Sequence, residues 1–454
     1  MKVLLLAFFA LFSFALGTPQ NWALVVAGSN GYYNYRHQAD AMHAYKMLRE
    51  HGFDRNHLIT MVYDDIANHP SNPIRGNIIN FPGGPNVYSN DIDYRGNTVT
   101  AENFLKILFG DKNAMHGVGS GRVIESGPDD NIFVFFSDHG APGIISFPVG
   151  GYLHAADLIN TITKMHDAKK YHQMLLYIEA CESGPQPCSP RPLHTRSPPI
   201  RLDRTRWFRS MFDGKLPADL HVFAATAANP TESSWACYWD DDRNAYLGDT
   251  FAVTVLEDSD RADMASETIG TQFARAKSLT TESHVMQYGD TAILALTLNN
   301  FLMGRSSYLP IKMIANAAPQ PLPRASFDQV NSRDIVLATL LRTLPKQAPG
   351  SPEQAAHMAA IDAELAHRHT ADRRTRALVH AVTGTGLHEL SPRRMNALEP
   401  QVRDCLPHAI AAYEAACGQF SDYSIDHVKT LAHLCELGVA PAEVAKSALK
   451  QCRL

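Results

Sequence analysis

The chain of 454 residues has a hydrophobic content of 45%, which is enough for a large core and indicates two domains. Its net charge is −5 and 19% of its residues are charged, so the charge balance favours neither a nucleic-acid-binding protein nor a disordered acidic tail. No segment after the first 20 residues is apolar enough to cross a bilayer, and we expect no membrane span.

The first residues, MKVLLLAFFALFSFALGTPQ, predict a secretory signal peptide over residues 1–17. Lys2 supplies the positive end, residues 3–16 form the apolar stretch, and Ala15-Leu16-Gly17 is a small-x-small cleavage site. The alternative is a membrane anchor, but the apolar run is shorter than the ~20 residues that a span needs. We therefore expect the mature protein to be soluble, in the secretory pathway or outside the cell.

Five short apolar runs predict β-strands at residues 22–28, 57–63, 131–138, 174–180 and 220–226. Between the first two runs, Ala41, Tyr45 and Leu48 recur at helical spacing and Gly52 closes a predicted helix. Apolar strands that alternate with helices are typical of an α/β fold with a mostly parallel sheet. Functional groups gather at the carboxyl ends of such strands. Three predicted strands end there in AGSNGYYNYRH, SDHG and EACESG.

Proline, serine and glycine cluster between residues 303 and 352, as in an exposed linker. Beyond it the pattern is helical, with Ser351 as a cap and Pro352 in the first turn. We place an α/β domain at 18–305, a linker at 306–350 and an all-α domain at 351–454. The last domain is rich in histidine and would gain positive charge as the pH falls toward about 5.

The segment 185–209, PQPCSPRPLHTRSPPIRLDRTRWFR, has no periodicity and predicts an extended loop. Two interpretations stay open: a genuine loop, or non-native sequence such as an unspliced segment. Four of the seven cysteines lie in the last fifty residues and can pair among themselves in an oxidising compartment. Of Cys181, Cys188 and Cys237, at least one should then be a free thiol. Cys188 could pair with Cys237 or approach Cys181, although Cys237 is most simply a buried thiol.

Cys181 and His139 each follow a predicted strand and precede small residues or a turn. A cysteine protease needs a thiolate, an imidazole that takes its proton and usually a group that orients the imidazole. Gly140 permits a close backbone approach, so its N–H can help to bind an oxyanion. From the pattern alone, Cys181 can equally be a core thiol, and the His-Gly pair can be only a turn.

Six segments occur in order between about residues 22 and 304: VVAGSNGYYNYRHQADAMHAY, MVYDDIA, FFSDHGAPGIISFP, YIEACESG, AANPTESSWACYWDDDRNAYLGD and TTESHVMQYGD. They closely resemble the legumain family of asparaginyl endopeptidases, and the resemblance continues more weakly through the C-terminal helices. It implies a caspase-like fold and a zymogen of a cysteine endopeptidase that cleaves after Asn, and after Asp at low pH. It also implies protein and peptide substrates, an acidic compartment such as the lysosome, and no cofactor or metal.

The resemblance implies that Cys181 is the nucleophile, that His139 is the general base and acid, and that Asn34 orients the histidine. The backbone N–H groups of Gly140 and Cys181 would form the oxyanion site, and the role of Asp138 stays open. The implied specificity pocket consists of Arg36, His37, Glu179, Ser233, Ser234 and Asp249. A guanidinium and two carboxylates can satisfy both ends of a carboxamide. From the residues alone, the alternative is an internal Arg36–Glu179 ion pair.

The C-terminal domain resembles the legumain prodomain, which keeps the enzyme latent until acid weakens its contact with the active site. The resemblance implies the disulfides Cys405–Cys435 and Cys417–Cys452, whereas four cysteines alone allow three connectivities. It also implies activating self-cleavage at Asn331, for which the alternative is an ordinary solvated asparagine. Cystatin-type inhibitors are expected as further partners. Family members usually carry N-glycans, but this chain has no N-x-Ser/Thr sequon, so glycan-dependent sorting is not expected.

Three other functions compete with hydrolysis. A peptide ligase would use the same thioester, and nothing in the sequence separates it from a hydrolase. A catalytically silent binding protein on the same fold is disfavoured by the intact Asn34, His139 and Cys181. The transamidase subunit that attaches GPI anchors shares NYRH and HG…C elements, but it normally carries a C-terminal membrane segment instead of a four-cysteine helical domain.

Overall fold

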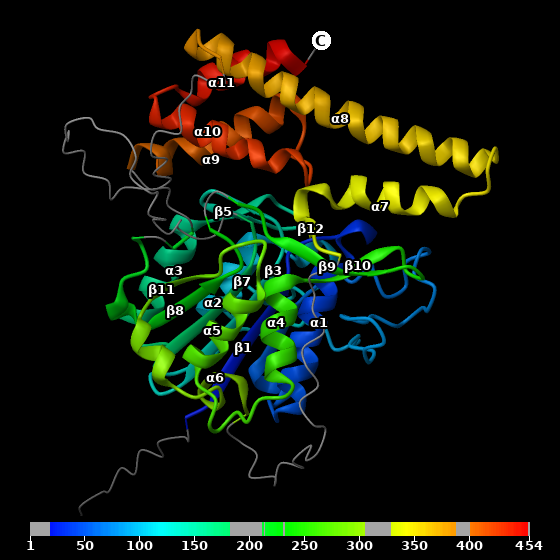
Figure 1. Ribbon diagram of the computed structural model, residues 1–454. Helices are drawn as coiled ribbons and strands as arrows, with labels where there is room; N and C mark the ends of the chain where they lie inside the picture. Colours follow the sequence, from blue (N-terminus) through cyan, green and yellow to red (C-terminus); the bar gives the residue numbers. More distant parts are fainter. Residues whose placement is uncertain are drawn as a thin grey trace, which may run out of the picture.

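Figure 1 shows the computed structural model of the chain, which describes residues 19–181, 211–212, 214–229, 232–304, 328–386 and 400–452. The predicted signal peptide at 1–17, the predicted loop at 185–209 with Cys188, and the linker residues before 328 lie outside the described residues. Within those ranges, no helix is long and apolar enough to span a membrane.

A six-stranded sheet with strand order β11-β8-β7-β3-β1-β2 forms the centre of the first domain. Its strands are β1 (Asn21–Ala27), β2 (Leu58–Met61), β3 (Asn131–Ser137), β7 (Gln173–Glu179), β8 (Val222–Thr226) and β11 (Met286–Gly289). All pairings are parallel except that of β11 with β8. The five predicted strands and the mostly parallel α/β class are confirmed. Strand β11 was not predicted, because its sequence MQYG contains no continuous apolar run.

Helices cover both faces of this sheet. They are α1 (Tyr35–Glu50), α2 (Ala101–Phe109), α3 (Ala155–Asp167), α4 (Thr250–Ser259), α5 (Ile269–Leu279) and α6 (Asn299–Leu302). Alternate strand residues point to opposite faces. Val25 and Phe135 therefore pack with α1, α4 and α5, whereas Leu24 and Val134 pack with α2 and α3. Gly52 follows α1 with a φ of 83°, a left-handed conformation that glycine adopts at low cost.

Two three-stranded sheets lie near the carboxyl ends of the central strands. One has the order β4-β5-β6 and the other β10-β9-β12. Their strands are β4 (Gly140–Ala141), β5 (Ile144–Ser146), β6 (Tyr152–His154), β9 (Trp235–Asp240), β10 (Ala245–Asp249) and β12 (Val330–Asn331). Because β12 belongs to the predicted linker, this part of the linker is a strand paired with the first domain.

The C-terminal region is helical and lies over the side of the first domain that carries β5 and β12 (Figure 1). Its helices are α7 (Ile335–Thr343), α8 (Pro352–Thr383), α9 (Pro400–Cys417), α10 (Val428–Glu436) and α11 (Pro441–Cys452). Ser351 caps α8, as predicted, by accepting a hydrogen bond from the backbone N–H of Gln354. Ala141 and Ile144 of the first domain belong to the same hydrophobic cluster as the helical core, so the two domains share an apolar contact.

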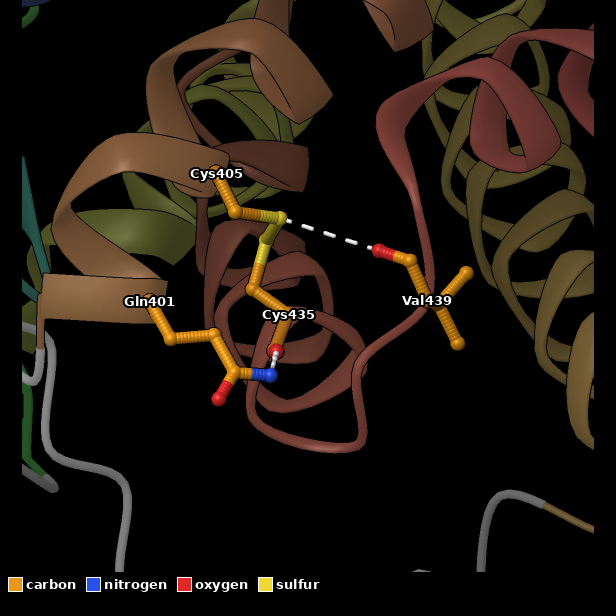
Figure 2. The surroundings of a disulfide bond; sticks show 4 residues. All are labelled: Gln401, Cys405, Cys435 and Val439. Atoms are coloured by element: carbon orange, nitrogen blue, oxygen red, sulfur yellow. Dashed lines mark hydrogen bonds between the residues drawn. A yellow bond between two sulfur atoms is a disulfide. The ribbon is translucent and has the colours of Figure 1, made fainter.

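Two disulfides join the helices: Cys405 of α9 to Cys435 of α10, and Cys417 of α9 to Cys452 of α11. These are the pairs that the resemblance implied. Figure 2 shows the first of them, where Nε2 of Gln401 donates to the carbonyl oxygen of Cys435 at 3.1 Å and Val439 lies on the other side. Cys181 and Cys237 are the free cysteines of the described part of the chain, and both are buried.

Replacing Cys417 and Cys452 together with serine should destabilise the helical domain by about 3 to 4 kcal/mol, because their disulfide closes a long loop in the unfolded chain. The two cysteines are 35 residues apart. The loss of unfolding free energy is measured by denaturant titration, with limited proteolysis of the C-terminal region as the readout. Wild-type protein treated with reductant, which opens both disulfides, should lose at least as much stability. A loss below about 1 kcal/mol would contradict the expectation.

Candidate active site

Cys181 and His139 lie at the same edge of the central sheet. Strands β3 and β7 pair in parallel with Ser137 opposite Glu179, and each candidate residue lies two positions beyond this pair. A Cβ atom at Gly140 would come within 2.6 Å of the carbonyl oxygen of Cys181, so glycine is needed for this close approach. The structure therefore places the backbones that carry the two predicted residues side by side, with both side chains buried.

Asn34 orients the imidazole of His139. It ends the 3₁₀ helix η1 (Tyr32–Asn34), and its Oδ1 lies 3.0 Å from Nε2 of His139. Nη1 of Arg36 donates to the same oxygen at 3.2 Å. Because this oxygen only accepts, Nε2 of His139 carries the hydrogen that faces Asn34. Nδ1 has no hydrogen-bond partner among the described residues, so it is the nitrogen that can accept a proton from a thiol.

The thiol of Cys181 is held by Ser234. The backbone N–H of Ser234 donates to Sγ at 3.3 Å, and Oγ of Ser234 lies 3.4 Å from Sγ. These two contacts fix the position of the sulfur atom at the end of β7. Ser233, the other serine predicted for the pocket, precedes Ser234 in the chain and is partly buried.

The residues assigned to the specificity pocket by the resemblance form a buried polar cluster beside the two candidate residues. Nε of Arg36 donates to Oδ1 of Asp249 at 2.9 Å, so the guanidinium pairs with Asp249 rather than with Glu179, the alternative considered from sequence. Oε2 of Glu179 accepts from the backbone N–H of Ala252 in the first turn of α4, at 2.9 Å. Nδ1 of His37 lies 2.7 Å from Oγ of Ser29, and its Nε2 lies 3.4 Å from Oδ2 of Asp249.

Three atoms of this pocket have no hydrogen-bond partner within the described ranges: Nη2 of Arg36, Oε1 of Glu179 and Oδ2 of Asp249. All three side chains are essentially inaccessible to solvent. Buried polar atoms are normally paired, because an unpaired one costs about 1 to 3 kcal/mol. One donor and two acceptors are therefore left without a hydrogen bond among the described residues, and Oδ2 of Asp249 faces Nε2 of His37 at 3.4 Å.

Burial sets the protonation of the pocket. It raises the pKa of Glu179 well above its usual value, and the nearby Asp249 raises it further. Burial also raises the pKa of Asp249, an effect that Arg36 partly offsets. The same burial lowers the pKa of His37, so its imidazole is neutral at physiological pH. In mildly acidic solution, the pocket can therefore offer both carboxylate acceptors and a carboxylic acid donor.

Asp138 lies beside the pocket with its role still open. Its carboxyl group is buried and neither oxygen has a hydrogen-bond partner in the described part of the protein. Burial raises its pKa well above the usual range. Ligand atoms of His37, Asp138 and His139 lie within 4.8 Å of one another, although no metal was expected from the sequence. Because His139 is the candidate base, an ion bound there would compete with proton transfer.

The helical domain reaches the candidate histidine directly. Oδ2 of Asp422 accepts from Nδ2 of Asn34 at 3.1 Å, and its Oδ1 lies 3.4 Å from Nε2 of His139. Burial alone would raise the pKa of Asp422, but His139, Asn34 and Arg36 together hold it well below its usual range. A cavity of about 160 Å³ lies between Asp138, His139 and residues 419–422. Tyr152 also donates to Glu414 at 2.6 Å across the domain contact.

The linker passes through the same region as an extended segment. Strand β12 pairs antiparallel with β9, with Asn331 opposite Trp235. The backbone N–H of Ser332 donates to the carbonyl oxygen of Ser234 at 3.1 Å, and Nη2 of Arg333 donates to the carbonyl oxygen of Gly140 at 2.9 Å. Oδ1 of Asn331 accepts from the backbone N–H of Arg333 at 2.9 Å. Ser332, rather than Asn331, therefore lies opposite the serine that holds the thiol.

The structure thus brings together the cysteine, the histidine, Asn34 and the pocket residues predicted from sequence. Sequence reasoning did not identify Asp422, Ser332 or Arg333, because their contacts with Asn34, Ser234 and Gly140 join positions about 100 or more residues apart. It also missed Asp40, although HQAD directly follows the arginine of the pocket. The only sequence signal for Asp40 is a carboxylate on the otherwise buried face of a helix.

An α/β sheet that presents a cysteine beside an oriented histidine, under a disulfide-bonded helical domain, defines a cysteine peptidase covered by its own C-terminal domain. Residues 21–187 and 209–307 match the Peptidase C13 family, and residues 359–452 match the legumain prodomain. The chain belongs to this family, the legumains. It is a cysteine endopeptidase zymogen with protein or peptide substrates, and its prodomain is an intramolecular partner.

Relatives align over nearly the whole chain. Legumain of Bos taurus is 39% identical over 92% of this chain and 89% of its own length. Legumain of Homo sapiens is 37% identical with the same coverage. A vacuolar-processing enzyme of Citrus sinensis is 33% identical over 95% of this chain and 84% of its own length. Caspase-1 from Spodoptera frugiperda, 12% identical, covers 64% of this chain and 92% of its own with a TM-score of 0.35, too low to add to the argument.

Proposed function

We propose that this protein is an acid-activated endopeptidase that cleaves after asparagine. The observation that carries the proposal is the set of three unpartnered pocket atoms, one donor and two acceptors. The side chain of asparagine offers one carbonyl oxygen and an NH₂ group with two hydrogens. The oxygen would accept from Nη2 of Arg36, and the NH₂ would donate to Oε1 of Glu179 and Oδ2 of Asp249. A substrate without a carboxamide would leave these buried atoms unpaired.

Catalysis would follow from the geometry around Cys181. Nδ1 of His139 takes the thiol proton, and the thiolate attacks the backbone carbonyl carbon of the asparagine. The oxyanion is stabilised by the backbone N–H groups of Gly140 and Cys181. His139 then gives its proton to the leaving amine, which produces a thioester. Water attacks the thioester while His139 takes its proton, and the C–S bond breaks to release the peptide that ends in asparagine. The proton on His139 returns to the sulfur, which regenerates the free enzyme.

Latency would have two causes. The helical domain covers the histidine through Asp422, and the linker occupies the substrate region through β12. The linker is not itself a good substrate in this register, because Asn331 turns its carboxamide oxygen onto its own backbone. Cleavage after Asn331 would therefore require the linker to shift or to leave. Low pH would favour this step as carboxylates at the domain contact become protonated.

Replacing Ser332 with asparagine should turn the linker into a substrate in its latent position. The new side chain would stand opposite Ser234 and could enter the pocket that binds asparagine. We expect self-cleavage at neutral pH to accelerate at least about tenfold and to occur after residue 332 instead of 331. Mass spectrometry of the products distinguishes the two sites. Ser332→Gln is the control of similar size; cleavage of Ser332→Asn only after 331, at the wild-type rate, would contradict this register.

Replacing Asp422 with asparagine should speed activation about three- to tenfold at every pH between about 4 and 7. The carboxylate is about a third exposed, with a side-chain exposure of 34%, so solvent screens part of its effect. The pKa of Asp422 is depressed in the folded protein. Asp422 therefore stabilises the contact between the two domains at every pH above the usual aspartate pKa of about 4, and this stabilisation is lost only below it. The activation midpoint should therefore stay unchanged. A shifted midpoint would identify Asp422 as the acid trigger and contradict the expectation.

Several finer assignments rest on the same proposal. We propose the secretory pathway and an acidic compartment, or secretion, as the location, and cystatin-type inhibitors as further partners, with no nucleic acid. The alternative activity is peptide ligation, in which an amine replaces water in the attack on the thioester. The buried site around Cys181 favours neither hydrolysis nor ligation. A catalytically silent protein remains the other alternative if the 185–209 loop blocks the substrate. The domain limits of 18–305, 306–350 and 351–454 are kept as proposals.

The test is turnover of an Asn-containing fluorogenic peptide by the purified full-length chain. It is assayed at neutral pH and again after incubation near pH 4 to 5. Activity that arises only after acid, together with cleavage after Asn331, is the expected result. No turnover by a folded chain would contradict the proposal. A variant lacking residues 185–209 should then be assayed, since recovered activity would assign the failure to that loop.

A further inference from the structure

Behind the candidate specificity pocket lies a third buried carboxyl group, Asp40, in α1. Asp40, Glu179 and Asp249 are all fully inaccessible to solvent. Oδ1 of Asp40 accepts from Nδ2 of Asn80 at 2.8 Å and, more weakly, from the backbone N–H of Asp249 at 3.4 Å. Its Oδ2 lies 3.0 Å from Oγ of Ser137, the residue paired with Glu179 across β3 and β7. The three carboxyl groups therefore belong to one buried polar cluster.

The charges of this cluster do not balance if every carboxyl group is ionised. Arg36 is the cation that pairs with it, through Asp249. Three carboxylates and one guanidinium would leave two uncompensated negative charges in the interior, which is very costly. At least one carboxyl group must therefore hold a proton. Asp249 has the guanidinium, and Glu179 has a backbone N–H in the first turn of α4, which offsets part of the burial that raises the pKa of Glu179.

Asp40 has only neutral partners. Both donors to Oδ1, Asn80 and the backbone of Asp249, fix that oxygen as the acceptor of the carboxyl group. Oγ of Ser137 lies 3.0 Å from Oδ2; it donates to this oxygen when Asp40 is ionised, and a hydroxyl oxygen can equally accept from it when Oδ2 carries the proton. Asn80 cannot turn over to donate elsewhere, because its Nδ2 also donates to the carbonyl oxygen of Leu247 at 2.9 Å.

A row of hydrogen bonds from Asn80 through His43 to Asp260 supports this orientation of the Asn80 amide. Oδ1 of Asn80 lies 2.7 Å from Nδ1 of His43, and Nε2 of His43 lies 2.9 Å from Oδ2 of Asp260. Both neighbours of the imidazole are acceptors, so His43 is doubly protonated and donates to each. Burial would lower the pKa of His43, but Asp260 and Asn80 raise it overall. His43 thus holds the amide oxygen of Asn80 toward itself and the NH₂ group toward Asp40.

We propose that Asp40 is held as a neutral carboxylic acid and is a positioning residue of the asparagine pocket, which keeps Asp249 ionised and paired with Arg36. This inference rests on the proposed function. The groups that face Asp40 come from four strands and from its own helix. They are Ser137 on β3, Glu179 on β7, Cys237 on β9, Asp249 on β10 and, through Asn80, His43 on α1. Burial, with Asp249 nearby, raises the pKa of Asp40 well above its usual value.

A proton held on Asp40 makes both stability and activity depend on pH. A carboxyl group whose pKa is raised by folding stabilises the protein least at high pH, because the folded form must then give up a proton that it holds. Stability is therefore lost as the pH rises from the usual value of about 4 through the raised pKa of Asp40. Ionised Asp40 would also repel Asp249 and loosen its pairing with Arg36, so activity on asparagine should fall over the same range.

The test compares three variants of the acid-activated enzyme. Asp40→Ala, which leaves Asn80 without its acceptor, should lower kcat/KM for an Asn peptide about 10- to 30-fold at pH 5. Asp40→Asn reproduces the neutral acid: its oxygen accepts from Asn80 and its NH₂ donates to Ser137. We expect it to restore kcat/KM to within about threefold and to remove the alkaline decline. Glu257→Gln is the control, a buried acid that accepts from Tyr238 outside the pocket.

Thermal melting of the same proteins between about pH 5 and 7 provides a second readout. Wild type and Glu257→Gln should lose about 5 °C more over this range than Asp40→Asn. An unchanged pH profile and melting curve in Asp40→Asn would overturn the inference. So would an Asp40→Asn chain that fails to fold or is inactive at pH 5, because the neutral isostere should fit. If the wild type had no activity on asparagine, the proposed function would fail, but the melting experiment would still test the proton on Asp40.

Discussion

Replacing Cys181 with alanine should lower turnover of an Asn peptide by about 10⁴-fold or more without unfolding the protein. The thiolate forms the covalent bond to substrate, and nothing else in the site can take its place. The side chain is buried, and Ser234 is the hydrogen-bond partner of its sulfur among the described residues. We therefore expect little change in the melting temperature, since a buried cysteine is a small hydrophobic side chain.

The matched control is the other buried free thiol, Cys237. Burial raises the pKa of Cys237 well above its usual value, so it is an unreactive thiol at any pH of interest. Cys237→Ala should keep its activity once activated. The Cys181→Ala chain should also stay uncleaved after Asn331 in acid, and added active enzyme should cleave it there. Residual activity within about a hundredfold of the wild type would contradict the role of Cys181 as nucleophile.

Replacing Arg36 with glutamine should lower kcat/KM for an Asn peptide by about 10³-fold or more and destabilise the protein by about 3 to 5 kcal/mol. In the proposed mechanism, the guanidinium donates to the side-chain oxygen of the substrate asparagine. In the structure, it pairs with Asp249 and donates a hydrogen bond to Asn34. Its loss leaves Asp249 buried without a counter-charge. Kinetics on the activated variant measure the first effect, and denaturant unfolding measures the second.

Arg243→Gln is the control for Arg36→Gln. Arg243 is also buried and bonds to Asn77 at 2.8 Å, but it lies in the β9–β10 turn. The Arg243→Gln variant should be less stable than the wild type but should keep the preference for asparagine. If the Arg36 variant still preferred an Asn peptide over the matching Ala peptide by the wild-type factor, the guanidinium would not be the donor in the pocket.

The central sheet could be predicted from sequence because its strands are short continuous apolar runs, as in NIFVFFS and QMLLYIE. Parallel pairing then places the residues after β3 and β7 at one edge, which is why His139 and Cys181 could be recognised as neighbours. The edge strand β11 and the short strand β12 could not be predicted. Their sequences carry no apolar run, and their positions depend on pairing with β8 and β9.

The pocket could be predicted only in part, because its polar side chains come from distant parts of the chain. Arg36 and Asp249 are 213 residues apart, and the ion pair between them corrects the Arg36–Glu179 pair considered from sequence. The contact of Asp422 with Asn34 spans 388 residues. No local pattern marks a single aspartate as the residue that reaches a histidine in another domain. The resemblance supplied the identity of the pocket, whereas the structure supplies its unpartnered atoms.

The most direct measurement of the central claim is kcat/KM of the activated enzyme for peptides that differ only in the residue before the cleaved bond: Asn, Asp, Gln and Ala. We expect kcat/KM for the Asn peptide to exceed that for the Gln and Ala peptides by about 10³-fold or more. We also expect the Asp peptide to be cleaved only in acid. There, a protonated Glu179, Asp249 or substrate carboxyl group can supply the hydrogen that the NH₂ group of asparagine otherwise provides. Equal rates for Asn and Ala would contradict recognition by Arg36, Glu179 and Asp249.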